Sequence, residues 1–179
     1  MTTSFQRNLT RPLLQWWQNN GRKDLPWQES PSIYKTWVSE IMLQQTQVVT
    51  VIPYFKKFIK AFPSVTSLAE ATEDQVMSHW SGLGFYSRAR NLHKSSKIIV
   101  DQYKGIIQKR LDDLIALPGI GRSTAGAILS LSCIEPRPIL DGNVKRVLTR
   151  FFNISGDLKL SKTNNKLWSL AIGCLPETD

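Results

Sequence analysis

The sequence is poor in the features that define several special protein classes. It has two cysteines, Cys133 and Cys174, far apart and without a CxxC pair, and two histidines, His79 and His93. No disulfide framework or metal site is therefore expected, and both cysteines are predicted to be buried thiols in a reducing compartment. No apolar run approaches the roughly 20 residues of a spanning helix, and the N-terminus lacks a secretory signal, which favours the cytoplasm.

Glycine and proline are also scarce, at 10 and 9 of 179 residues, which excludes a disordered or collagen-like chain. Hydrophobic residues make up 41%, as in ordinary globular proteins, so the chain is expected to bury a core and form one or two domains. Charge is the informative deviation, since 23 Lys and Arg against 14 Asp and Glu give a net charge of +9. A polyanion is the first partner to consider, with nucleic acid ahead of an anionic membrane surface.

Helical spacing of apolar residues dominates the chain, and alternating strand patterns are almost absent. Ser67 with Glu70 and Thr72 with Gln75 have the spacing of capping boxes, which mark helix starts. The expected fold class is all-α with short connections. Helices are predicted over the ranges 51–62, 86–103, 110–116 and 122–133, from 141 onward, and around 167–171.

The helix predicted over 86–103 has a basic side. Residues 86–110 hold seven Lys or Arg against Asp101 alone. A solvated helix face is the usual explanation of such a pattern, and a nucleic-acid surface is the functional one. The basic residues are Arg88, Arg90, Lys94, Lys97, Lys104, Lys109 and Arg110.

The segment Leu117-Pro118-Gly119-Ile120-Gly121 joins two predicted helices. Glycines on both sides of an apolar residue let the backbone approach a ligand closely, and the amides that open the next helix suit a phosphate. The alternative is an ordinary turn whose Ile120 fills the core. The basic surroundings favour a DNA-backbone clamp without sequence information.

Glu40 lies among apolar residues in the segment SEIMLQQTQV at 39–48. Desolvation of a carboxylate raises its pKa, which suits a general acid at neutral pH. A position on the polar side of an amphipathic helix is the alternative. Gln44, Gln45 and Gln47 are amides able to read or replace a base, although helical glutamines are usually just solvated.

Asp141 precedes Gly142-Asn143-Val144 and is a favoured helix N-cap. An aspartate held ionised at a helix start is also suited to stabilising positive charge that develops on a substrate, and the two roles are compatible. The inner face of this helix is predicted to consist of Val144, Val147, Leu148 and Phe151.

Five segments in this order resemble the MutY adenine-DNA glycosylases of the helix-hairpin-helix superfamily. They are LPW at 25–27, SEIMLQQTQV at 39–48, GLGFYSRARNLHK at 82–94, LPGIGRSTAGAILSL at 117–131 and ILDGNVKRVL at 139–148. The resemblance implies an all-α helix-hairpin-helix glycosylase fold with two helical lobes and the active-site cleft between them. Residues 25–135 would form the lobe with the hairpin, and residues 1–24 with 136–179 the second lobe.

The resemblance implies base excision repair, in which adenine mispaired with 8-oxoguanine or guanine is flipped out and its N-glycosidic bond hydrolysed. Glu40 would be the acid that protonates adenine, and Asp141 the carboxylate that stabilises or transiently bonds the sugar, assisted by Asn143. Residues of the base pocket and duplex wedge would be Trp27, Leu43, Gln44, Phe85 and Tyr86. Residues that bind the DNA backbone would be Gly119, Gly121, Arg122, Ser123 and Thr124, with a monovalent cation at the hairpin.

One position distinguishes subclasses of this superfamily. Relatives similar to endonuclease III place a Schiff-base lysine where this chain has Ser123, and a hydroxyl forms no imine with the sugar. The resemblance therefore implies a monofunctional glycosylase that acts as a monomer on double-stranded DNA in the cytoplasm, associated with the nucleoid. An endonuclease III-like pyrimidine enzyme and a non-catalytic DNA-binding fragment are the alternatives.

The sequence departs from the family at two places. Position 85, more often tyrosine in the family, is Phe85, so a hydroxyl near 8-oxoguanine is lost. The chain ends at Asp179, before the four cysteines that hold a [4Fe-4S] cluster and before the domain that recognises 8-oxoguanine. The cluster is expected from the family, while its cysteine ligands are missing from this sequence.

Overall fold

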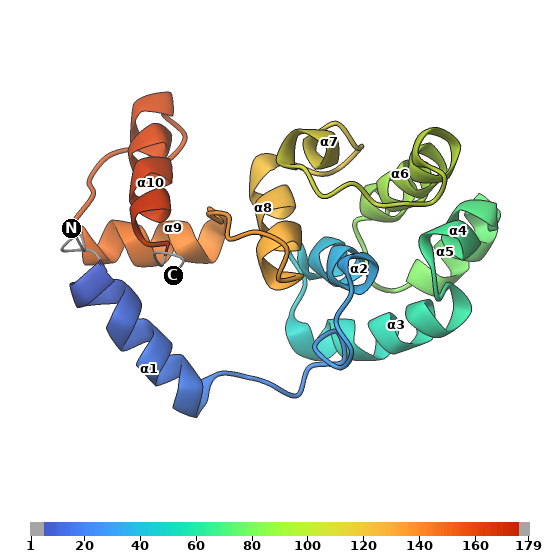
Figure 1. Ribbon diagram of the computed structural model, residues 1–179, viewed down its shortest axis with the longest axis horizontal. Coiled ribbons are helices and arrows are strands. Elements are labelled where there is room, and N and C mark those ends of the chain that lie inside the picture. The colour runs from blue at the N-terminus through green and yellow to red at the C-terminus, as the bar shows by residue number, and fades with distance from the viewer. Residues whose placement is uncertain (1–5, 176–179) are drawn as a thin grey trace. The chain divides into compact units, whose positions relative to one another are not determined.

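The computed structural model describes residues 6–175, and within that range its regular elements are helices (Figure 1), so the all-α prediction is confirmed. None of the described helices is both long and apolar enough to cross a membrane. In chain order the elements are η1 (Gln6–Thr10), α1 (Arg11–Asn20), α2 (Ile33–Leu43), α3 (Val48–Ala61), α4 (Val65–Glu70), α5 (Glu73–Trp80), α6 (Ser87–Tyr103), α7 (Leu111–Ile115), α8 (Arg122–Leu131), α9 (Gly142–Phe151) and α10 (Ser161–Gly173).

The chain divides into two compact units. One unit is Lys23–Glu135, which holds α2 to α8, and the other combines Met1–Arg22 with Pro136–Asp179. The division leaves the segments that carry Glu40 and the LPGIG turn in the first unit, and the segment that carries Asp141 in the second.

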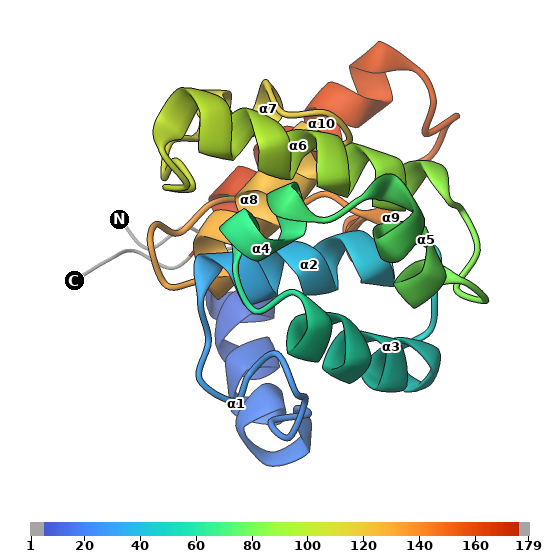
Figure 2. The ribbon, with the colours of Figure 1, turned by 90° about the vertical axis from the view of Figure 1, so that its right-hand side faces the viewer.

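Helix α2 is the central element of unit Lys23–Glu135. It packs against α3, α6 and α8, which surround it in Figure 2. Helices that are apolar on nearly all sides are buried in this way, and Trp37, Val38 and Met42 are at most 1% exposed. The Tyr34 hydroxyl donates to the carbonyl of Phe62 at 2.8 Å and ties the start of α2 to the end of α3.

The helix starts partly follow the predicted signals. Thr72 and Gln75 form the expected capping box at α5, with reciprocal bonds of 3.2 and 2.8 Å. The prediction for Ser67 with Glu70 is wrong, because α4 begins at Val65 and its capping box is Ser64 with Ser67. Two serines at the same spacing compete for the cap, and the earlier one follows Pro63 directly.

Helix α6 matches the helix predicted over 86–103, and it buries one face, with Ala89, Leu92, Ser96 and Ile99 in the core. The helix ends at Tyr103, and its C-cap residue Lys104 has a left-handed backbone with φ of 54°. The prediction that all the basic residues of 86–110 are on the surface is wrong for Arg88, whose side chain is buried.

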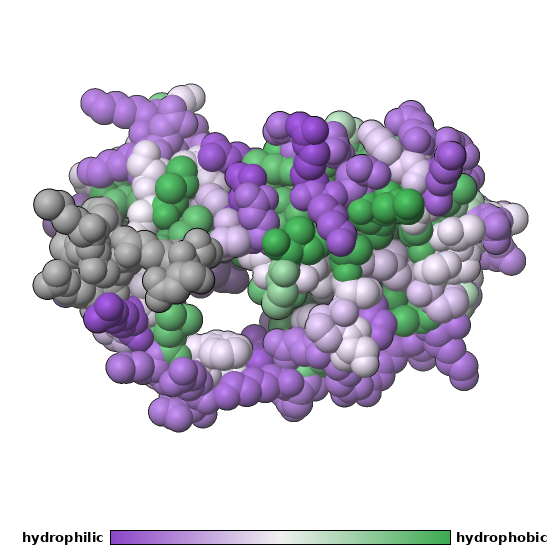
Figure 3. Space-filling model, viewed as in Figure 1, coloured by the Kyte–Doolittle hydropathy of each residue, from purple (hydrophilic) through white to green (hydrophobic). Residues whose placement is uncertain are grey.

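The unit of Met1–Arg22 and Pro136–Asp179 has a small core of Leu140, Leu148, Leu167 and Ala171, where α9 packs on α10. The predicted inner face of α9 is wrong for Val147 and Phe151, which are 49% and 47% exposed. Hydrophobic surface of this kind is visible in green among the purple hydrophilic side chains of Figure 3.

The cysteine prediction is half wrong. Cys133 is exposed, beyond the end of α8, in a left-handed conformation with φ of 53°. Cys174 is half-buried after α10, and this burial raises the pKa of its thiol.

Candidate active site and nucleic-acid interface

Glu40 lies on α2, one turn before that helix ends at Leu43. Its neighbours Ser39 and Ile41 are buried, while Glu40 itself is half-buried. The carboxyl is therefore neither enclosed in the core nor fully solvated. Its environment is intermediate between the apolar one and the polar helix side that the sequence allowed. A half-buried carboxyl is both partly desolvated and accessible to a ligand, which a general acid requires.

The chain turns sharply after α2. Gln44 leaves the helix, and Gln45 has a left-handed backbone with φ of 57°. Gln44 donates from Nε2 to the Thr124 hydroxyl at 3.4 Å and is half-buried, whereas Gln45 is exposed. Of the two neighbouring amides, Gln45 is thus the one presented to a partner, which the sequence pattern could not distinguish.

Arg88 organises this end of α2, and sequence reasoning missed it. Its guanidinium donates to the carbonyls of Ile41 at 3.1 Å, Met42 at 2.8 Å and Gln44 at 2.5 Å. These are among the last carbonyls of α2, which have no partner within the helix. A cation at a helix C-terminus also complements the helix dipole. Arg88 therefore replaces the glycine cap that α2 lacks.

The same guanidinium holds a second loop, Gly82–Tyr86. It donates to the carbonyl of Gly84 at 3.1 Å and lies 5.2 Å from the centre of the Phe85 ring. Burial lowers the pKa of Arg88. The sequence offers one indication of this role, because Arg88 follows the glycine-rich segment 82–84. It was missed because its segment contains many other basic residues.

Phe85 and Tyr86 are exposed aromatic residues, at 56% and 41%. Phe85 has a left-handed backbone, with φ of 48°. A bulky residue in this region is strained, and such strain persists where the surrounding structure holds it, often at binding sites. The structure thus holds an aromatic ring at the surface at an energetic cost.

A surface pocket of about 400 Å³ lies between the two loops. Its lining combines Gln44 and Gln45 with Phe85, Ser87 and Arg88. Two of the predicted wedge residues, Gln44 and Phe85, therefore lie at one site. Gln45 and Phe85, whose backbones are left-handed, are both part of this lining.

Trp27 and Leu43 do not line this pocket. Both are partly buried and pack on the core of the unit, and Trp27 contacts Phe55 edge to face with ring centres 5.4 Å apart. Their positions are thus explained by packing, and a role in holding a base stays a prediction.

The LPGIG segment forms a tight turn between α7 and α8. Gly119 has φ of 79°, and a Cβ on it would lie 2.9 Å from the Cβ of Asn91 on α6. Glycine is needed there both for the left-handed backbone and for the close approach. Ile120 is 5% exposed, so the core-filling alternative for this residue is also correct.

The hairpin presents the start of α8 to solvent. Gly121 is the N-cap of α8, and Gly121 and Arg122 are exposed, while Ser123 and Thr124 are half-buried in its first turn. The buried Ser95 hydroxyl of α6 donates to the carbonyl of Pro118 at 3.0 Å and fixes the turn. Exposed backbone amides at a rigid helix start suit an anion.

Asp141 caps α9, as predicted. Its Oδ1 accepts a hydrogen bond from the amide of Val144 at 2.8 Å, and its carbonyl accepts one from Lys145 at 2.9 Å. Asp141 and Asn143 are exposed. The cap is established, and a catalytic role for either residue stays a prediction.

Fewer free cations are exposed along the basic segment 86–110 than its seven Lys and Arg residues indicate. Arg88 is buried, and Arg90 forms an ion pair with Glu73 at 3.1 Å. Arg110 lies 3.9 Å from Asp113. The exposed cations that remain in 86–110 are Lys94, Lys97, Lys104 and Lys109.

The expected iron-sulfur cluster does not fit this chain. A [4Fe-4S] cluster is held by four thiolates, and the sequence has two cysteines. Within residues 6–175, no group of three or more His, Cys, Asp or Glu side chains could hold a metal ion. No step of the chemistry below therefore depends on a cluster.

The helical unit with its hairpin and its loop pocket is the architecture of a DNA-repair glycosylase domain. The family model "HhH-GPD superfamily base excision DNA repair protein" matches residues 38–171, and the chain belongs to this family.

Relatives with similar sequences are adenine DNA glycosylases. That of Buchnera aphidicola subsp. Acyrthosiphon pisum (strain APS) is 56% identical over 164 residues, which is 92% of this chain and 47% of that protein. That of Rattus norvegicus is 39% identical over 178 residues, covering 94% of this chain and 34% of the relative. The chain spans at most about half the length of these relatives.

Solved structures confirm the fold. A thermostable thymine-DNA glycosylase matches with a TM-score of 0.85 and 22% identity, over 96% of this chain and 79% of that one. A non-covalent endonuclease III-DNA complex matches with a TM-score of 0.75 and 22% identity, over 97% of this chain and 84% of that one.

Proposed function

We propose that this chain carries the catalytic region of a monofunctional adenine-DNA glycosylase. It would hydrolyse the N-glycosidic bond of adenine mispaired with 8-oxoguanine or guanine in double-stranded DNA. The observation that carries the proposal is the 56% identity to an adenine DNA glycosylase over 92% of the chain. The half-buried carboxyl of Glu40, on the helix that leads into the pocket of Gln45 and Phe85, supports it.

In the proposed reaction, Glu40 donates its proton to the flipped adenine, and the C1′–N9 bond breaks with its electron pair leaving on the base. The ionised carboxylate of Asp141 stabilises the oxocarbenium-like sugar, assisted by Asn143. Water then forms the new bond to C1′ and returns a proton to Glu40, which regenerates the acid. The two carboxyl groups thus act in opposite protonation states, as in glycoside hydrolases.

The duplex would be opened at the loop pocket. Phe85 and Tyr86 supply exposed rings for stacking against bases. Gln45, exposed and left-handed, is a better wedge than Gln44, whose amide is bound to Thr124. Trp27 and Leu43 would wall the adenine from the core side.

The hairpin would hold the DNA backbone. Exposed amides of Gly121 and the first turn of α8 would bind a phosphate, together with Arg122, Ser123 and Thr124. A monovalent cation is the second ligand proposed at Gly119 and Gly121, and duplex affinity measured in K⁺ and in tetramethylammonium tests it.

The test is a single-turnover assay of adenine release from an adenine:8-oxoguanine duplex by the 179-residue chain. Release that disappears in Glu40→Gln supports the proposal. Duplex binding without release would instead identify a non-catalytic DNA-binding chain. Covalent trapping on DNA by borohydride would identify an endonuclease III-like lyase, which Ser123 in place of the lysine argues against.

A further inference from the structure

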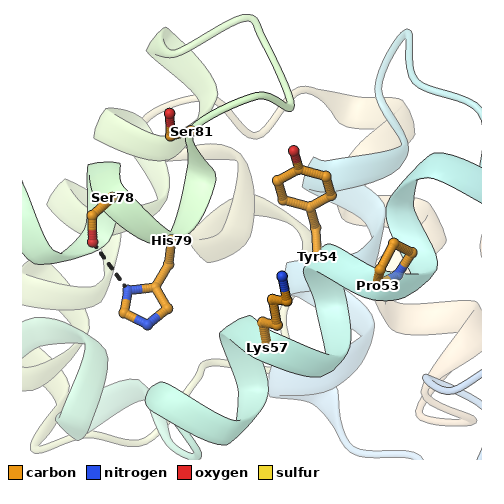
Figure 4. A pocket seen from close by; sticks show the side chains of 6 residues that line it. All are labelled: Pro53, Tyr54, Lys57, Ser78, His79 and Ser81. Carbon is orange, nitrogen blue, oxygen red and sulfur yellow. Dashed lines mark hydrogen bonds between the residues drawn. The ribbon is translucent and has the colours of Figure 1, made fainter.

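A second surface pocket, of about 330 Å³, lies between α3 and the end of α5. Figure 4 shows Tyr54 and Lys57 on α3 facing the side chains of the α5 end across open space. The pocket has no part in the proposed chemistry of adenine release. Its full lining is Pro53, Tyr54, Lys57, Ser78, His79 and Ser81.

The lining is rich in hydrogen-bond donors. Lys57 supplies an ammonium group, and Tyr54 and Ser81 supply hydroxyls. These described lining residues include no aspartate or glutamate, so the formal charge of the lining is positive. A ligand with several acceptor oxygens and negative charge matches such a set.

The orientation of His79 is fixed by its neighbours. Its Nδ1 lies 2.9 Å from the carbonyl of Gln75, and its ring packs edge to face on Phe62 with centres 5.1 Å apart. A carbonyl only accepts hydrogen bonds, so Nδ1 carries a proton. With its proton on Nδ1, the neutral ring offers Nε2 only as an acceptor, so the donors of the pocket are Lys57, Tyr54 and Ser81.

The pocket adjoins the loop that carries Phe85. A Cβ at Gly82 would collide with the Tyr54 hydroxyl, so the phenol lies directly against the loop backbone. Ser81 precedes Phe85 by four residues, a reach of at most ~14 Å. One DNA strand carries a phosphate every ~3.4 Å of helix axis, so the pocket lies within about four nucleotides of a base step contacted by Phe85.

We propose that this pocket binds a phosphate group, held by Lys57, Tyr54 and Ser81 and bordered by His79. Resting on the proposed function, we assign it to a backbone phosphate of the duplex within about four nucleotides of the step that Phe85 contacts. Such a contact would carry no sequence information and would fix the register of the duplex on the wedge loop.

The first experiment measures duplex affinity against salt concentration by fluorescence anisotropy. Lys57→Met is expected to weaken binding about tenfold and to reduce the salt slope by about 1, the effect of one lost phosphate contact. Lys56→Met is the matched control, because Lys56 is exposed on the same helix outside the pocket. Equal effects of the two variants would overturn the assignment to the backbone.

The second experiment identifies the phosphate. Duplexes with a single neutral methylphosphonate at successive positions are bound by the parent chain and by Lys57→Met. One position within four nucleotides of the mismatch should weaken the parent chain and leave the variant unaffected. If every position weakens both proteins equally, the backbone assignment is wrong.

The third experiment is independent of catalysis and of DNA. Inorganic phosphate is titrated while the imidazole NMR signals of His79 and His93 are followed. His79 should shift in the parent chain and not in Tyr54→Phe with Lys57→Met, while His93, buried in α6, serves as an internal control. A shift without a methylphosphonate effect would assign the pocket to free phosphate. No shift and no salt effect would overturn the phosphate site, whether or not adenine is released.

Discussion

Replacement of Arg88 by methionine tests whether one buried guanidinium holds both loops of the site. The change removes the donors to the carbonyls of Ile41, Met42 and Gly84, and it leaves the first two in a buried environment. An unsatisfied buried acceptor costs about 1–3 kcal/mol. Two such acceptors cost about 2–6 kcal/mol, and removal of a buried charge with its desolvation cost offsets part of this, so we expect a net loss of about 2–4 kcal/mol.

Urea unfolding followed by tryptophan fluorescence measures this loss as a lower midpoint. Arg90→Met is the control, since Arg90 is two residues away, exposed, and paired only with Glu73 at the surface. A surface ion pair is worth about 0–1 kcal/mol. Arg88→Lys keeps the charge but has a single ammonium group, which cannot span both loops. Its urea midpoint should therefore lie between those of Arg88→Met and Arg90→Met.

Duplex affinity provides the second readout. In Arg88→Lys, measured at a temperature at which the variant is folded, the Gln45 and Phe85 loops lose their common anchor, and affinity for mismatched DNA should fall by more than affinity for a single strand. The reasoning is refuted if Arg88→Met is as stable as Arg90→Met, or if Arg88→Lys binds the mismatch as the parent chain does.

Four further changes give distinct results. Glu40→Gln should abolish single-turnover adenine release and preserve duplex affinity, because the amide keeps the shape and donates no such proton. Asp141→Asn should leave the melting temperature unchanged, since asparagine caps helices equally well, and slow the chemical step on the order of 100-fold; an unchanged rate would remove Asp141 from the mechanism. Gly119→Ala should lower the free energy of unfolding by about 1–2 kcal/mol, whereas Gly121→Ala, at φ of −89° with nothing within 4 Å, should cost less, since alanine there only weakens the N-cap of α8. Burial lowers the pKa of His93, so as the pH falls the unfolded chain binds a proton at this histidine before the folded chain does. The free energy of unfolding should therefore fall as the pH drops below about 6.5. This pH dependence should be weaker in His93→Gln.

Features that depend on neighbours in sequence were predictable. The Thr72 capping box and the Asp141 cap need only residues three positions apart, and both occur as expected. The extent of α6 followed from apolar spacing alone. Where two local signals competed, as at Ser64 and Ser67, spacing could not choose between them.

Features that depend on distant segments were not predictable. Arg88 belongs to a run of basic residues, and its burial depends on the end of α2, more than forty positions away in the chain. The contrast between Gln44 and Gln45 depends on Thr124 of α8 and on one backbone angle. Exposure of Cys133 follows from its position beyond the last turn of α8, which apolar spacing did not indicate.

The contacts of Arg88 link the proposed acid to the proposed wedge. Glu40 lies on the last turns of α2, the carbonyls of that end are held by the guanidinium, and the same group holds the loop of Phe85. A rotation of α2 that moved the Glu40 carboxyl would have to break these bonds, at a cost of about 1–3 kcal/mol each. Insertion of Phe85 into a duplex and presentation of the acid therefore depend on one rigid arrangement, so loss of Arg88 should impair opening of the duplex and proton transfer together.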